Sequence, residues 1–508
     1  MTKTNTLGQL RNFTIKHKPK SAAEVKSLIL NFNENKTPFY AVSTGHNWGY
    51  GCDSTHIDNT ECIDLSQMNK IVFFDEEAGV ITLEPGVTYG QLSSFLKTSG
   101  NKWLTPVHGG GPDCSIIGNA TERGYGLTPY TDHFGACLSL KAILPSGQDY
   151  ASPFLSIGQN HISRFFRNGI GPYLDGIFTQ SSFGIITEMT IKLAPSPEET
   201  ELFFISFDDS HLEKSVEIIK RIKTAFGSSL GGVNIMNKER VLSMLTDYPT
   251  ELIKERKKIP YSEVERLKKN HMLTDWTMVG AFYGDPYVTK AVRKSLKIHF
   301  KDLKGRKIFF NKKKLRFAKK ILSLLNFSFL DGLRKSLSST EELFTILSGV
   351  PKKTALNLAY WKNLQMKMPE TPNPTEDECG LIWYAPLVQT KPNNVRDYVN
   401  MLKTVSERNE FNPLITLTTV DELTFDSTVP IVFNKKDQED FNRAHKYHDD
   451  LFKTGKENGF YPYRLGTNSM HNFRNDTSPN NLDLITKIKT AVDPDHLYAQ
   501  GRYSKLTK

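Results

Sequence analysis

Two glycine-rich segments, Ser43-Thr44-Gly45-His46-Asn47-Trp48-Gly49-Tyr50-Gly51 and His108-Gly109-Gly110-Gly111-Pro112-Asp113-Cys114-Ser115, carry the strongest signal in this sequence. The second segment continues to Arg123-Gly124-Tyr125-Gly126. Neither has the G-x-G-x-x-G spacing of a Rossmann dinucleotide site or the Gly-Lys-Ser/Thr of a P-loop. Both present backbone N–H groups without crowding by Cβ atoms, and such groups can donate to pyrophosphate oxygens. One such loop is typical of a tight turn, but two together favour phosphate binding.

Short strand and helix patterns alternate on both sides of these loops. Residues 39–43 are expected to form a strand that enters the first loop. Residues 88–96 have helical spacing, with Thr88 as the N-cap. Pro195-Ser196-Pro197 is the clearest boundary, and a second α/β pattern extends from 198 to about 450. No fixed-period repeat or long low-complexity linker is visible, so we expect docked domains.

The composition is that of a globular protein of two or three domains. The chain has 508 residues, of which 38% are apolar and 24% charged. It contains no apolar run long enough to span a membrane, and its start lacks the apolar region of a signal peptide. We therefore expect a cytoplasmic protein. The five cysteines are scattered and form no C-x-x-C pair, so neither a disulfide framework nor a metal site is expected.

The positive charge is concentrated in one segment. The net charge is +10, and residues 301–320 hold ten Lys or Arg against one acid, Asp302. Because the rest of the chain is close to neutral and no nucleic-acid motif is present, nucleic acid is not an expected partner. Residues 312–335 mix basic and apolar side chains. A solvated helix with one core face is the first interpretation. A peripheral contact with an anionic membrane surface, or with an acidic partner, is the alternative.

Several longer stretches resemble the vanillyl-alcohol oxidase and p-cresol methylhydroxylase (PCMH-type) family of FAD-linked enzymes, in its 4-substituted-phenol branch. They are Gly118–Phe134, Gly171–Ser181, Gly184–Thr187, Val429–Lys436 and the tail from Val492 to Pro494 with Gly501. The match spans most of the chain and is weakest between about 210 and 340.

This resemblance implies an α+β fold with two domains. A PCMH-type FAD-binding domain would comprise residues 1–197 and the returning segment 456–508. An α/β cap, the substrate domain, would comprise residues 198–455.

The resemblance also implies FAD as the cofactor, with its pyrophosphate on the two glycine-rich segments. The implied cofactor-binding residues are Ser43, Thr44, Gly45, His46, Asn47, Gly49, Gly51, Gly110, Gly111, Ser115, Gly118, Asn119, Arg123, Gly126 and Ile185.

His46 is a candidate for a covalent bond to the flavin. Alignment on 431–434 places Ser427 where the vanillyl-alcohol oxidase branch carries its linking histidine, and a serine cannot form that bond. Gly45-His46-Asn47 instead resembles the histidine loop of berberine-bridge-type oxidases. A neutral imidazole is a competent nucleophile near pH 7. The alternative is that His46 only hydrogen-bonds the cofactor or a neighbouring loop.

Four residues match the catalytic positions of the family: Asp113, Tyr50, Tyr463 and Arg464. Asp113 matches an acid near flavin N5, where an anion can stabilise positive charge or take a proton. The other three match the residues that grip a phenolate oxygen. Holding a phenol ionised at pH 7 lowers its pKa by about 3 units, or about 4 kcal/mol, which one guanidinium and two O–H donors can supply. The alternatives are a turn role for Asp113 and an ordinary surface pair for Tyr463-Arg464.

The expected function is therefore FAD-dependent hydride removal from a para-substituted phenol, through a quinone-methide-like intermediate. Two alternatives stay open: a related flavoprotein acting on a sugar, hydroxy acid or other alcohol, and a non-catalytic flavin-bound or membrane-docked interaction protein. The expected electron acceptor is O2 or a redox protein, and the family is often dimeric.

Overall fold

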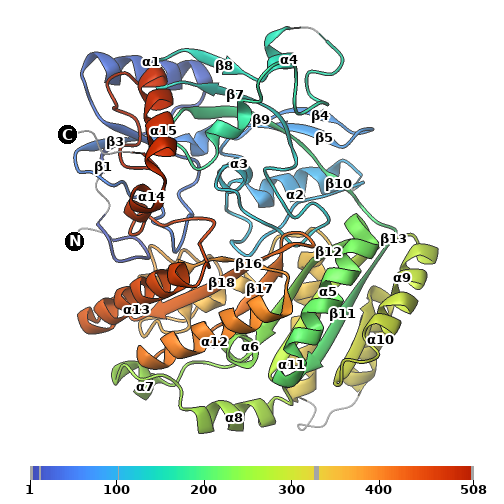
Figure 1. Ribbon diagram of the computed structural model, residues 1–508. Coiled ribbons are helices and arrows are strands. Elements are labelled where there is room, and N and C mark those ends of the chain that lie inside the picture. The colour runs from blue at the N-terminus through green and yellow to red at the C-terminus, as the bar shows by residue number, and fades with distance from the viewer. Residues whose placement is uncertain (1–3, 11–12, 101, 159, 325–330, 505–508) are drawn as a thin grey trace.

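The computed structural model describes residues 4–10, 13–100, 102–158, 160–324 and 331–504, which form two stacked lobes (Figure 1). The upper lobe in this view contains the N-terminal part of the chain, in blue to cyan, together with the red C-terminal tail. The lower lobe contains the green to orange middle of the chain. Helices and sheets occur in both lobes, so the expected α+β class is confirmed.

The N-terminal lobe contains a small parallel sheet and a larger antiparallel sheet. The parallel sheet has the order β1 (Phe13–His17), β3 (Thr60–Asp64), β2 (Phe39–Val42). The antiparallel sheet has the order β4 (Ile71–Asp75), β5 (Val80–Leu83), β9 (Ile185–Lys192), β7 (Cys137–Ile143), β8 (Asp149–Ala151). A short ribbon pairs β6 (Trp103–Leu104) with β10 (Ala194–Pro195).

The helices of this lobe cover the two sheets and receive the returning tail. They are α1 (Ala22–Glu34), α2 (Tyr89–Thr98), α3 (Ile116–Thr121), α4 (Pro153–Ser156), α14 (His471–Asp476) and α15 (Pro479–Val492). The expected N-cap is confirmed, since the Thr88 hydroxyl accepts from the Gln91 N–H at 3.2 Å. The tail is fixed by Lys489, whose ammonium donates to the carbonyls of Ser182 and Tyr498, each at 2.7 Å.

The second lobe is built on one large antiparallel sheet. Its order is β14 (Arg306–Asn311), β11 (Glu199–Phe207), β13 (Trp276–Gly284), β12 (Leu230–Asn237), β17 (Thr416–Thr419), β18 (Thr424–Phe433), β15 (Gly380–Tyr384), and β16 (Leu387–Gln389) also pairs with β18. The helices of this lobe are α5 (Leu212–Phe226), α6 (Lys238–Leu245), α7 (Thr250–Lys254), α8 (Tyr261–Asn270), α9 (Pro286–His299), α10 (Lys312–Leu324), α11 (Asp331–Leu347), α12 (Pro392–Arg408) and α13 (Gln438–Glu457).

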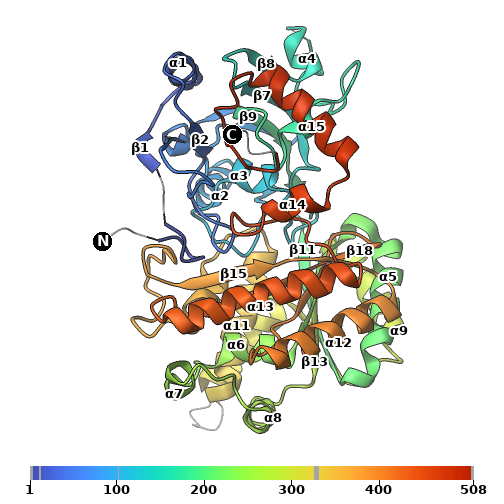
Figure 2. The same cartoon turned by 60° about the vertical axis from the view of Figure 1, so that its left-hand side comes forward.

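Side chains alternate between the two faces of β15 and β18, as strand geometry requires. Ile382 and Ile431 pack into the core beneath the helices of the second lobe, where α12 and α13 lie across the sheet (Figure 2). Leu381 and Val432 point the other way and join the core of the N-terminal lobe. This end of the sheet therefore presents one face directly to the N-terminal lobe.

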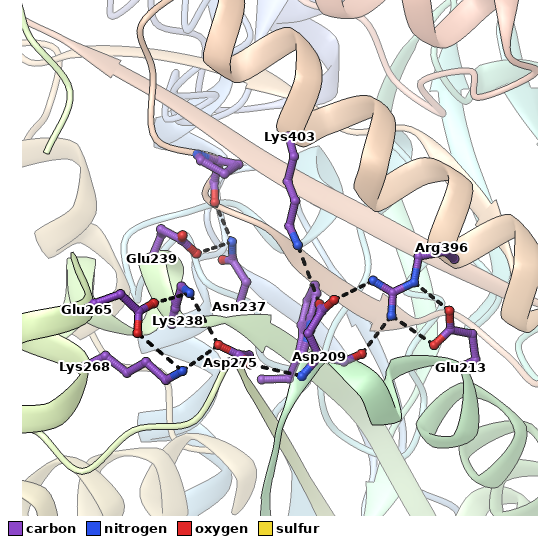
Figure 3. A network of polar contacts seen from close by, with 12 residues as sticks. Asp209, Glu213, Asn237, Lys238, Glu239, Glu265, Lys268, Asp275, Arg396 and Lys403 are labelled. Carbon is purple, nitrogen blue, oxygen red and sulfur yellow. Dashed lines mark hydrogen bonds and ion pairs between the residues drawn. The ribbon is translucent and has the colours of Figure 1, made fainter. Parts of the chain in front are cut away.

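A polar network fastens the helical side of the second lobe (Figure 3). The Arg396 guanidinium on α12 donates to both carboxylate oxygens of Glu213, at 2.6 and 2.9 Å, and to Asp209 at 2.7 Å. The indole N–H of Trp276 also donates to Asp209, at 2.7 Å. The network joins α12 to α5 and to the start of β13, so it stabilises the second lobe.

The basic segment forms the edge strand β14 and helix α10. Leu315 is buried against the sheet, with Leu202 and Tyr283. Phe317 and Ile321, one turn apart, are 68% and 42% exposed. Part of the segment 312–335 lies outside the described residues. Within the described ranges, no helix combines the length and apolarity needed to cross a membrane.

Candidate active site

The first glycine-rich loop (residues 43–51) follows directly from β2 and packs under the second lobe. Gly49 has a φ of +77°, and a side chain there would collide with the indole of Trp383 on β15. That indole N–H donates to the Trp48 carbonyl at 3.1 Å. Gly51 has a φ of +118°, and a side chain there would collide with Thr467. Glycine is therefore required where this loop touches the opposite lobe and the C-terminal segment.

The second glycine-rich loop (residues 108–126) contains α3 and meets the first loop. Ser115 caps α3, since its hydroxyl accepts from the Gly118 N–H at 2.9 Å. A Cβ at Gly118 would lie 3.2 Å from the Ser43 hydroxyl. The two loops thus approach each other closely, as a pyrophosphate cradle requires.

A polar cavity of about 160 Å³ opens beside the first loop. Its lining includes Thr44, Gly45 and His46 from the loop and Asn373 from the second lobe. Two buried ring nitrogens near the loops, Trp48 Nε1 and His108 Nε2, have no hydrogen-bond partner among the described residues. Glycine cradles with unsatisfied donors nearby fit FAD. Among the same residues no metal-binding cluster of His, Cys, Asp or Glu is present.

His46 is held in one orientation. Its ring stacks on Trp48, with centroids 4.9 Å apart, and its Nδ1 lies 3.0 Å from the Asp113 carbonyl oxygen. That contact keeps the proton on Nδ1 and leaves the lone pair on Nε2. Burial lowers the pKa of His46, so the ring is neutral near pH 7. These are the properties that a flavin-linking histidine needs.

The structure brings Tyr50, Tyr463 and Arg464 together, although they come from opposite ends of the chain. The Arg464 guanidinium carbon lies 4.2 Å from the centre of the Tyr50 ring. The Tyr463 ring packs against Tyr125, with centroids 5.2 Å apart. Burial raises the pKa of both Tyr50 and Tyr463, so each hydroxyl stays protonated and can donate.

Arg464 is itself held by Glu122, which the sequence did not indicate, and by Asn47, which was predicted to bind the cofactor. Its Nε lies 3.1 Å from a carboxylate oxygen of Glu122, and it donates to the amide oxygen of Asn47. Glu122 also pairs with Arg502 from the C-terminal tail. Glu122 lies inside the Gly118–Phe134 motif that indicated the family. Only the fold shows that it pairs with Arg464.

Asp113 lies outside this cluster. Its carboxylate is 54% exposed and lies 3.5 Å from the Lys353 ammonium of the second lobe. It belongs to the same loop junction as His46 through its backbone carbonyl. Its role near flavin N5 stays a prediction.

Several other predicted cofactor residues make contacts within the protein. The Asn119 amide oxygen lies 2.6 Å from His133 Nδ1, and Arg123 Nε donates to Thr179 at 3.1 Å. Ile185 packs in the core between α1 and the tail. Gly110 and Gly111 stay in the second loop, where a side chain at 110 would collide with His108. The assignment of these residues to FAD stays a prediction.

Ser427, which the alignment matches to the linking histidine of the vanillyl-alcohol oxidase branch, is buried on β18. Its hydroxyl accepts from Tyr398 of α12 at 2.7 Å, so the side chain points into the helical core.

This fold and site define the chain as an FAD-dependent oxidoreductase with two lobes. The family described as "FAD binding domain" matches residues 15–149. The chain is 30% identical over 495 residues to 1'-carboxy-chondrochloren decarboxylase from Chondromyces crocatus, covering 96% of this chain and 89% of that protein. It is 24% identical over 489 residues to the flavoprotein subunit of the hydroxylating 4-cresol dehydrogenase from Pseudomonas putida, covering 94% and 85%.

Among solved structures, 4-ethylphenol oxidase from Gulosibacter chungangensis in its isoeugenol complex superposes with a TM-score of 0.86 at 19% identity, over 99% of this chain and 92% of that one. The chain belongs to the PCMH-type family of FAD-dependent enzymes that the sequence motifs indicated.

Proposed function

We propose that this enzyme removes a hydride from the benzylic carbon of a para-substituted phenol. The observation that carries the proposal is the convergence of Tyr50, Tyr463 and Arg464 at the junction of the two lobes. Two neutral hydroxyl donors and a guanidinium are the groups that hold a phenolate oxygen.

Tyr50, Tyr463 and Arg464 must supply the free energy that keeps a bound phenol ionised. A phenol ionises near pH 10, so binding it as the phenolate at pH 7 requires about 4 kcal/mol of differential stabilisation. Hydrogen bonds that involve a charged partner contribute about 1.5–3 kcal/mol each, and burial strengthens them. Arg464 with two tyrosine hydroxyls is sufficient, even though Glu122 offsets part of the arginine charge.

FAD supplies the hydride acceptor when it is bound. Tyr50, Tyr463 and Arg464 hold the phenolate oxygen at one end of the substrate. A phenolate donates electron density to the para carbon, which makes loss of hydride from the adjacent benzylic carbon feasible. The quinone-methide-like product then adds water or leaves.

Anaerobic mixing of the holoenzyme with a panel of 4-alkylphenols tests this function. We expect the oxidised flavin band to bleach with the phenols and to persist with the matching 4-alkylanisoles, which cannot ionise. Bleaching by hydroxy acids or sugars, but not by phenols, would favour the alternative alcohol oxidase. A flavin that none of these compounds reduces would favour the non-catalytic interaction protein.

Oxidative loss of CO2 from a carboxylated phenol is a second candidate. The similarity to 1'-carboxy-chondrochloren decarboxylase, at 30% identity over 96% of this chain, favours this candidate. A benzylic hydride leaves the substrate, the resulting quinone methide loses CO2 from the next carbon, and a vinylphenolate forms. Release of labelled CO2 from a 3-(4-hydroxyphenyl)propanoate derivative, in step with flavin bleaching, would distinguish this reaction from simple oxidation.

A further inference from the structure

Asp426 is a buried carboxyl group at the junction of the lobes. It lies on β18 opposite Thr418 of β17 and Leu387 of β16, so strands flank it on both sides. Its neighbour Ser427 points into the helical core, so strand alternation directs Asp426 to the opposite face, toward the N-terminal lobe. Its side chain is only 5% exposed.

One oxygen of this carboxyl group is unsatisfied. Asp426 Oδ1 is buried and has no hydrogen-bond partner among the described residues. A buried acceptor without a donor is costly and calls for an explanation. Burial raises the pKa of Asp426 to about 7, although Arg464 opposes the shift. The group can therefore gain or lose a proton near neutral pH.

The charge of Asp426 acts on Tyr50, Tyr125 and Tyr463 at the junction of the lobes and on Tyr398 of α12, and Arg464 is the cation that acts on Asp426. Burial raises the pKa of these tyrosines, and the negative charge of Asp426 adds to the shift, while the positive charge of Arg464 lowers the pKa of Asp426 in turn. Arg464 is the cation of this group and is paired with Glu122.

A proton balance follows from these charges. Arg464 and Arg502 carry two positive charges, and Glu122 with ionised Asp426 carries two negative charges, so the cluster is neutral. A neutral phenol that gives its proton to Asp426 becomes a phenolate without changing this total. Loss of the proton to solvent would instead leave two anions together in a buried site, which is unfavourable.

We propose that Asp426 accepts the phenolic proton when the substrate binds. The phenolic O–H bond breaks, the electron pair stays on the substrate oxygen, and the proton forms an O–H bond at the unsatisfied Asp426 oxygen. Tyr50, Tyr463 and Arg464 then hold the phenolate. This step rests on the proposed phenol function and assigns a separate residue to its first proton transfer.

The test uses 4-fluorophenol, which has no benzylic hydrogen and cannot be oxidised, with the holoenzyme. The 19F chemical shift distinguishes bound phenol from bound phenolate. We expect phenolate on the wild type at pH 8 with no net release of a proton on binding, because Asp426 keeps the proton. On Asp426→Asn a bound phenolate must release one proton to solvent, which a pH indicator in weak buffer detects, and Asp426→Glu should restore binding without proton release. Glu422→Gln removes an exposed carboxylate from the same hairpin and is the matched control, which should behave as wild type.

The pH dependence supplies a second readout. Asp426 becomes protonated as the pH falls below about 7 and can no longer accept, so the affinity of the wild type for 4-fluorophenol should be independent of pH above this range and fall by up to about tenfold per pH unit below it. Asp426→Asn should lack this break. Phenolate on Asp426→Asn without proton release, with the wild-type pH profile, would overturn the inference while leaving the phenol site intact. A flavin-loaded wild type that does not bind the probe would overturn the phenol function itself, and this step with it.

Discussion

Replacing Arg464 with alanine is the most direct perturbation of the proposed phenolate site. The substitution removes the guanidinium that lies 4.2 Å from the Tyr50 ring centre and leaves Glu122 with Arg502 alone. Because both tyrosine hydroxyls stay protonated, the variant retains two donors but loses the compensating charge. A bound phenolate would then face the carboxylate of Glu122 without the cation between them.

The expected loss can be bounded from these contacts. Truncating one partner of a buried, hydrogen-bonded charge pair costs about 2–5 kcal/mol. Glu122 already neutralises part of the Arg464 charge, so we expect a cost in the lower part of this range, about 2–3 kcal/mol. This corresponds to a fall of about 30- to 150-fold in the rate constant of flavin reduction divided by the substrate Kd. Arg464→Lys keeps the charge but loses the simultaneous contacts with Glu122 and Asn47, so a smaller loss of about tenfold is expected.

Anaerobic stopped-flow reduction of the flavin by a 4-alkylphenol measures this ratio. Flavin content and melting temperature serve as controls, because a misfolded variant would lose the cofactor as well as the activity. The reasoning is refuted if flavin-loaded Arg464→Ala reduces at the wild-type rate, or if alanine and lysine variants lose equal activity.

Three further predictions concern the cofactor, the stability of the second lobe and the basic segment. If His46 links the flavin, yellow colour should stay with the acid-precipitated wild type and leave the His46→Ala pellet, whereas colour in both supernatants would contradict the linkage. Arg396→Met should lower the free energy of unfolding at pH 7 by about 1–2 kcal/mol in urea denaturation, discounted for partial exposure. Arg396 lowers the pKa of Glu213, and Trp276 with Arg396 outweighs burial to lower that of Asp209. This stabilisation is therefore present above about pH 4 and lost as the pH falls further, so the difference between the two proteins should shrink in acid; a pH-independent difference would argue against the ion pairs. Phosphatidylserine vesicles should retain the wild type at low salt through the exposed face of α10, and Phe317→Asp should abolish retention, while equal retention of both proteins would point to another surface.

The local patterns of the sequence determined the elements around the site. The strand before the first glycine-rich loop, the Thr88 cap and the glycine positions were all readable, because hydrogen-bonding and steric preferences act between close neighbours. The contiguous motifs from Gly118 to Phe134 and from Val429 to Lys436 identified the family, since each lies within one stretch of chain.

The tertiary structure decided which charges face one another. The pairing of Glu122 with Arg464 and Arg502, and of Asp113 with Lys353, joins residues far apart in the chain. The sequence pattern at residues 424–433 did not indicate which side chains of β18 face which lobe, and only the packing of α12 on one face showed that Ser427 points into the helical core and Asp426 toward the N-terminal lobe. A strand's pattern specifies that its faces differ, and the partners that cover each face specify what those faces do.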